Sequence, residues 1–240
     1  MKLLWFIPLG LLALLMFVLL RRRAYLACPY FFSYVLFAIA ADVTRFIALN
    51  HSSVYALTYW VTEAGYDILG ILVMYEVLRC VLGNLAHARW APLILPLLLS
   101  IGIGLSIAHR QAVPPKVTGV LVYIVLGEIA VRFVQVFVFA GLVTLVPLIG
   151  LRWRQYPFGV ATGFGLYATI MLLTTIKFSD FGTRFKFLWG ATSVVAYSLA
   201  VLIWIWFFSV PQKAATSSSE LSAPSPGDLK QYKDALRRMR

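Results

Sequence analysis

The residues of this chain that could do chemistry are ionisable side chains placed inside long apolar stretches. They are Asp42, Arg45, Glu63, Asp67, Glu76, Glu128 and Arg132. A charged group in the interior of a membrane costs about 2.5–3.5 kcal/mol on insertion scales. Such groups therefore face one another, a water-filled cavity or the membrane interfaces, and they are the first candidates for a ligand, ion or proton site.

Helical spacing places several of these groups on shared faces. Glu128, Arg132 and Gln135 fall within about 60° of one another around a helix axis, because successive residues are 100° apart. Two other apolar stretches each carry two ionisable groups on one face, three or four residues apart. The predicted ligand- or proton-binding residues are Asp42, Arg45, Glu63, Asp67, Glu128, Arg132 and Gln135.

Two interpretations of these residues stay open. An arginine can hold an anionic group in a charge-assisted fork, and four acids against two bases leave negative charge that favours a functional site, including a proton site. In the other interpretation, Asp42 with Arg45 and Glu128 with Arg132 are intrahelical pairs that only hold the bundle together. Glu76 points away from the face of Asp67 and lies near the end of its stretch.

The elements that must position these groups are membrane-spanning helices. Of 240 residues 61% are hydrophobic and only 12% are charged, and the mean hydropathy is +0.86. A helix needs roughly 20 apolar residues to cross the hydrocarbon layer. Seven stretches have that character: Leu3–Leu20, Pro29–Leu49, Val54–Val81, Ala91–Ala108, Val117–Ile149, Phe158–Ile176 and Phe187–Phe208. The sequence predicts an all-α bundle of seven transmembrane helices in contact with the lipid bilayer.

Positive charge sets the predicted orientation. The net charge of +12 lies in short clusters between apolar stretches and in the tail, which is not the pattern of a nucleic-acid-binding protein. With the N-terminus outside, thirteen Lys and Arg residues fall on the inner side and six on the outer side. Without the tail the ratio is seven to six, so the prediction of N-out/C-in depends on Arg21–Arg23. In this orientation the polar groups form an outward-facing pocket between the second, third and fifth helices.

Composition divides the chain into three regions. Residues 1–210 are the predicted seven-helix transmembrane domain, and residues 211–227 are a flexible linker rich in Ser, Pro and Ala. Residues 228–240 have the spacing of a short basic amphipathic helix, which either lies on the anionic inner leaflet or is a frayed, solvated tail.

Motifs for enzymatic or metal chemistry are missing from the sequence. His51, His87 and His109 are far apart, so no metal-ligand spacing is present and no metal or cofactor is expected. No serine or cysteine has the sequence context of a nucleophile, and an enzyme is not favoured.

The sequence therefore favours a receptor-like or sensor-like membrane protein that binds a small ligand or a proton in the outer pocket. The alternatives are a small secondary transporter using the same carboxylates, which predicts pseudo-symmetric halves, or a scaffold subunit of a membrane complex. A cytoplasmic or membrane partner protein would receive the signal of a receptor. A bacterial cytoplasmic membrane is the assumed location.

Overall fold

The computed structural model describes residues 2–82, 93–110, 113, 118–148, 155–181 and 186–210, and within these ranges the chain is all-α. The described ranges hold one short 3-10 helix, η1 (Ala24–Leu26), and seven α-helices. The α-helices are α1 (Lys2–Arg21), α2 (Pro29–Ala48), α3 (Ser52–Leu82), α4 (Ile94–Ala108), α5 (Val120–Leu148), α6 (Gln155–Phe181) and α7 (Lys186–Ser209). The predicted linker and tail helix lie outside the described residues.

Each of the seven predicted apolar stretches coincides with one helix, which confirms the all-α prediction. The largest difference is at the end of α6, which continues to Phe181 where the sequence predicted Ile176. The predicted end lies where the hydrophobic residues stop. The helix continues beyond that point because its backbone hydrogen bonds do not require apolar side chains.

The chain is a helical membrane protein. Four of its described helices contain segments long and apolar enough to cross a membrane: Pro29–Ala48, Val120–Thr144, Tyr156–Thr175 and Gly190–Ser209. Two shorter apolar helices are Phe6–Arg21 and Ile94–Ala108. The remaining helix, α3, is 31 residues long and carries the carboxylates of Glu63, Asp67 and Glu76.

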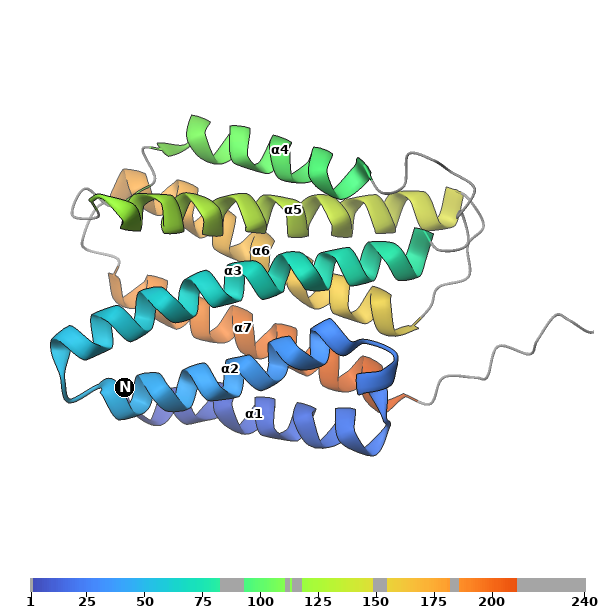
Figure 1. The fold of residues 1–240 in the computed structure, drawn as a ribbon, viewed down its shortest axis with the longest axis horizontal. Helices are drawn as coiled ribbons and strands as arrows, with labels where there is room; N and C mark the ends of the chain where they lie inside the picture. Colours follow the sequence, from blue (N-terminus) through green and yellow to red (C-terminus); the bar gives the residue numbers. More distant parts are fainter. Residues whose placement is uncertain are drawn as a thin grey trace, which may run out of the picture. The chain divides into compact units, whose positions relative to one another are not determined.

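The helices pack side by side in an order that differs from their order in the sequence (Figure 1). α3 contacts α2, α5 and α6, while α1 contacts α2 and α7. α4 lies along the outer side of α5, at one edge of the bundle (Figure 1). The helices α2, α3, α5, α6 and α7 therefore enclose the middle of the bundle.

An aromatic cluster forms much of the core between α2, α6 and α7. Phe31 and Trp204 meet edge to face with ring centroids 5.1 Å apart, and Phe31 stacks on Phe208 at 5.4 Å. The Trp204 indole Nε1–H donates to the carbonyl oxygen of Val160 at 3.2 Å. This bond satisfies the polar atom of the indole, which burial would otherwise leave without a partner.

Small residues on α6 allow α7 to come close. A Cβ atom at Gly159 would overlap the Phe207 ring, and one at Gly163 would overlap the Trp204 indole. The two glycines are four residues apart and lie on one helix face, which is the small-xxx-small arrangement of tightly packed membrane helices. The motif packs α6 against α7 within the chain.

Two contacts define one end of the bundle. The Arg22 guanidinium, just after α1, donates to the carbonyl oxygen of Ser209 at the end of α7, with an Nη2–O distance of 2.7 Å. Near the end of α3, the Glu76 carboxylate accepts backbone N–H groups of Tyr30 and Phe31, at 3.1 and 3.0 Å, where α2 begins. Glu76 thus supplies acceptors for donors that the first turn of a helix leaves unpaired. The ends of α1, α3 and α7 and the start of α2 lie together.

Candidate functional site

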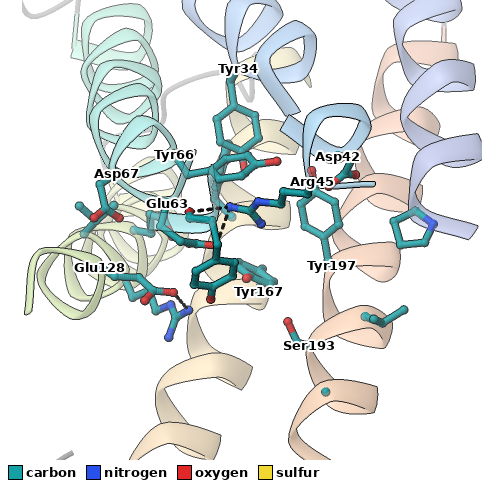
Figure 2. A pocket seen from close by; sticks show the side chains of 18 of the residues that line it. Tyr34, Asp42, Arg45, Glu63, Tyr66, Asp67, Glu128, Tyr167, Ser193 and Tyr197 are labelled. Carbon is teal, nitrogen blue, oxygen red and sulfur yellow. Dashed lines mark hydrogen bonds and ion pairs between the residues drawn. The ribbon is translucent and has the colours of Figure 1, made fainter. Parts of the chain in front are cut away.

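A cavity of about 610 Å³ lies inside the bundle, in the half where α1, α3, α5 and α7 begin and α2 and α6 end (Figure 2). Its walls come mainly from α2, α3, α5, α6 and α7, and Pro8 of α1 also reaches it. The lining residues are Pro8, Tyr34, Asp42, Arg45, Leu49, Tyr59, Glu63, Tyr66, Asp67, Glu128, Val131, Arg132, Gln135, Phe164, Tyr167, Gly190, Ala191, Ser193, Val194 and Tyr197.

All seven residues proposed from the sequence as ligand- or proton-binding line this one cavity. Asp42 and Arg45 come from α2, Glu63 and Asp67 from α3, and the stripe of Glu128, Arg132 and Gln135 from α5. The sequence placed the pocket between these three helices only. The structure adds walls from α6 and α7, which carry no acidic or basic side chain at the cavity.

Arg45 ties α2 to α3. Its Nη2 atom forms an ion pair with Glu63 Oε1 at 3.0 Å, and its Nε–H donates to Thr62 Oγ1 at 2.7 Å. Nη2 also donates to the backbone oxygen of Tyr59 at 3.3 Å. The guanidinium carbon lies 4.8 Å from the centre of the Tyr59 ring and 5.5 Å from that of Tyr66, within cation–π range.

Arg132 ties α5 to α6 from a buried position. It forms an ion pair with Glu128, one helical turn earlier on α5, and its side chain is only 9% exposed. Nη1 lies 3.5 Å from Thr175 Oγ1 on α6. The intrahelical pair that the sequence allowed between these two residues is therefore formed.

The second intrahelical pair allowed by the sequence is not formed, because Arg45 turns to Glu63 on the neighbouring helix. Within the described part of the chain, neither Asp42 nor Asp67 has an ion pair or hydrogen bond through its carboxylate. Asp67 lies against α5, since a Cβ atom at Gly127 would be 3.4 Å from its Oδ2. Two acids of the cavity thus form no direct contact with a basic side chain among the described residues, although Asp42 lies within electrostatic range of Arg45 and Asp67 within that of Arg132.

Five tyrosines line the cavity besides the predicted residues: Tyr34, Tyr59, Tyr66, Tyr167 and Tyr197. The Tyr34 and Tyr66 ring centroids are 5.7 Å apart, and those of Tyr167 and Tyr197 are 5.8 Å apart. Figure 2 shows the rings of Tyr34, Tyr66, Tyr167 and Tyr197 around the acidic and basic side chains. The Tyr197 hydroxyl is buried and has no hydrogen-bond partner within 3.5 Å among the residues the structure describes.

Sequence reasoning missed the tyrosines, although one helix carried a signal for them. Tyr59, Glu63 and Tyr66 follow one another at spacings of four and three residues, so they share the face of α3 that holds the carboxylates. Tyr167 and Tyr197 had no such signal, because the acidic and basic residues of α6 and α7 lie only at one end of each helix and do not indicate which face turns inward.

Glu76 does not belong to the site. Its carboxylate accepts the two N–H groups that begin α2, at the other end of the bundle, in agreement with its predicted direction away from Asp67. In the described ranges, no group of three or more His, Cys, Asp and Glu side chains is placed to hold a metal ion. The cavity offers paired arginines, unpaired carboxylates and aromatic faces, which suit reversible binding of a small molecule.

Comparison with known proteins adds no relative: no family model matches the chain, and neither a curated protein nor a solved structure has significant similarity to it.

Proposed function

We propose that this protein is a receptor-like membrane protein that binds a small ligand in the cavity. The observation that supports this proposal most directly is that all seven candidate side chains surround an open volume instead of filling it. At about 610 Å³, that volume lies within the range of roughly 300–1,000 Å³ usual for small-molecule sites. A scaffold subunit, whose charge pairs serve only packing, has no need of such a space.

The proposed topology is seven spans with the N-terminus outside and the C-terminus in the cytoplasm of a bacterial cell. The contact of Arg22 with Ser209 supports an odd number of crossings, because it brings the ends of α1 and α7 to the same end of the bundle. That end carries Arg21–Arg23, which favours the cytoplasmic side. The cavity lies in the other half, so the ligand would enter from outside.

The two arginine ties give the proposed receptor a way to respond to its ligand. Arg45 joins α2 to α3, and Arg132 joins α5 to α6. A ligand that contacts both Arg45 and Arg132 would connect these two helix pairs. It would favour the conformation in which the distance between the pairs suits its own size. A separate protein that binds the cytoplasmic end of the bundle would respond to this change in helix spacing.

Two matched glycine substitutions test ligand binding. A Cβ atom at Gly190, on the cavity wall, meets no atom within 4 Å, and the same is true of Gly104 on α4, away from the cavity. Gly190→Leu therefore adds a side chain at the cavity wall, where its Cβ meets no atom, while Gly104→Leu adds the same side chain elsewhere. We expect a panel of metabolites to raise the melting temperature of the wild-type protein and of Gly104→Leu in nanodiscs, but not of Gly190→Leu.

Two results would count against the proposal. If no metabolite shifts the melting temperature of the wild type, the cavity does not bind small molecules and a scaffold role gains support. If a bound metabolite accumulates in proteoliposomes that contain the purified protein, the protein is a transporter. A receptor binds the metabolite and leaves its concentration inside the liposomes unchanged.

A further inference from the structure

The charges of the cavity differ in whether they have partners. Each arginine forms an ion pair with one glutamate, Arg45 with Glu63 and Arg132 with Glu128. Asp42 and Asp67 form no ion pair in the described part of the chain, and Arg45 and Arg132 attract them only from a longer distance. A carboxylate inside a membrane protein is costly unless a proton or a cation neutralises it. The acidic side chains of the cavity outnumber the basic ones by four to two.

An anionic ligand fits this arrangement poorly. The Arg45 guanidinium already donates to a carboxylate, a hydroxyl and a backbone carbonyl, and it faces two tyrosine rings. Arg132 is held by Glu128 and by the Thr175 hydroxyl. An anion would have to displace an existing ion pair and would also meet two unpaired carboxylates.

The surroundings of Asp42 suit a cation. Figure 2 shows the Tyr197 side chain extending from α7 to the neighbourhood of Asp42 and Arg45. The Tyr197 hydroxyl is a buried polar group with no hydrogen-bond partner within 3.5 Å in the described part of the chain, and the Tyr34 side chain interacts with it only at longer range. The rings of Tyr34 and Tyr66 stand on the same side of the cavity. Aromatic faces attract ammonium groups, and their apolar surface accepts a hydrocarbon skeleton.

We infer that the ligand of this cavity is a small organic cation, an amine whose ammonium group pairs with Asp42 and whose hydrocarbon part packs against the tyrosine rings. This inference rests on the proposed function and specifies the ligand of the same site. Asp67 places a second carboxyl group at the cavity, beside Gly127 of α5. A divalent metal ion is a weaker candidate, because the described ranges offer no group of three ligating side chains and hard cations take six or more oxygen ligands.

The test compares amines with molecules of the same skeleton and different charge. The probes are 2-phenylethylamine, hexylamine and tryptamine, each beside its alcohol and its carboxylate counterpart: 2-phenylethanol, hexanol, tryptophol, 3-phenylpropionate, hexanoate and indole-3-propionate. Binding to the full-length protein is measured by calorimetry in nanodiscs of zwitterionic phosphatidylcholine, which avoids attraction of amines to anionic lipid. We expect at least one amine to bind, and its alcohol and carboxylate to bind at least tenfold more weakly.

Variants then locate the charge that the amine recognises. Asp42→Asn is expected to weaken amine binding about 10- to 100-fold, the usual effect of losing one hydrogen bond to a charged group. Glu76→Gln removes a carboxylate outside the cavity and should leave amine affinity unchanged. Tyr197→Phe, which removes only a hydroxyl, gives a second variant at the same place if Asp42→Asn does not fold, and it should weaken amine binding.

The outcomes separate this inference from the proposed function. If alcohols or carboxylates bind as tightly as amines, and Gly190→Leu abolishes their binding, the cavity is a ligand site and the inference of a cation is wrong. Equal loss of amine binding in Asp42→Asn and Glu76→Gln would also overturn it, since the effect would not be local. If no probe and no metabolite of any charge binds, the proposed function fails as well.

Discussion

The ion pair between Arg45 and Glu63 should be a main connection between α2 and α3, and a double-mutant cycle can measure it. The two side chains are only 11% and 15% exposed, so solvent screens their attraction weakly. Arg45→Met removes the ion pair, two further hydrogen bonds and two ring contacts, and it leaves the Glu63 carboxylate uncompensated. Breaking a buried pair in this way costs about 3–5 kcal/mol.

Glu63→Gln should be milder, because its amide oxygen still accepts from the guanidinium. We expect a loss of about 1–3 kcal/mol for this variant, the usual cost of a weakened buried hydrogen bond. The double variant should lose less than the sum of the two single losses, with a coupling of about 0.5–3 kcal/mol, because residues in contact are not independent.

The assay is reversible unfolding in mixed micelles by a denaturing detergent, followed by circular dichroism. Glu76→Gln is a suitable control, since its carboxylate lies at the other end of the bundle and the change should be additive with Arg45→Met. If Arg45→Met costs less than about 1 kcal/mol, or if the cycle with Glu63→Gln is additive, the pair does not hold α2 to α3 and the reasoning is refuted.

Three further predictions follow from the packing of the helices. Gly163→Ala should destabilise the protein by about 1–3 kcal/mol, because its Cβ would overlap the Trp204 indole. Gly104→Ala is the matched control: its Cβ meets no atom, so thermal melts should show a neutral or stabilising effect. Glu76→Gln should lower stability by about 1–3 kcal/mol, since it weakens the acceptors of two N–H groups at the start of α2, and an unchanged melting temperature would contradict that role. Burial raises the pKa of the Cys28 thiol, just before α2, to about 12. The thiol therefore stays neutral and unreactive at pH 8. In a variant with the other cysteine replaced by serine, mass spectrometry should find Cys28 unmodified after treatment of the folded protein with maleimide. Unfolding in SDS should make Cys28 reactive.

The location of the helices could be predicted from the sequence with good accuracy. Apolar stretches of sufficient length become helices in lipid because every backbone N–H and C=O group must find its partner within the segment. This requirement is local, so α2 begins at Pro29 and α7 covers the stretch from Phe187 to Phe208, as predicted. α3 was also recognised, although its carboxylates make it less apolar than its neighbours.

The sequence also determined which face of α2, α3 and α5 turns toward the polar groups. Residues three or four apart share a face whatever the tertiary structure is, which is why Glu128, Arg132 and Gln135 were identified as one stripe. The cost of charge in hydrocarbon then indicated that the polar faces of different helices meet. All seven residues identified in this way line the cavity.

Only the tertiary structure decided which partners these groups have. Asp42 and Arg45 satisfy the spacing of an intrahelical pair, yet Arg45 pairs with Glu63 because α3 brings a carboxylate, a hydroxyl and two rings to the guanidinium at once. The positions of Tyr167 on α6 and Tyr197 on α7 likewise depend on how these two helices are rotated about their axes. That rotation is set by their packing, in which the Trp204 indole lies directly against Gly163. Distances between helices depend on the packing of all side chains together, and they cannot be derived from the spacing of residues along a single helix.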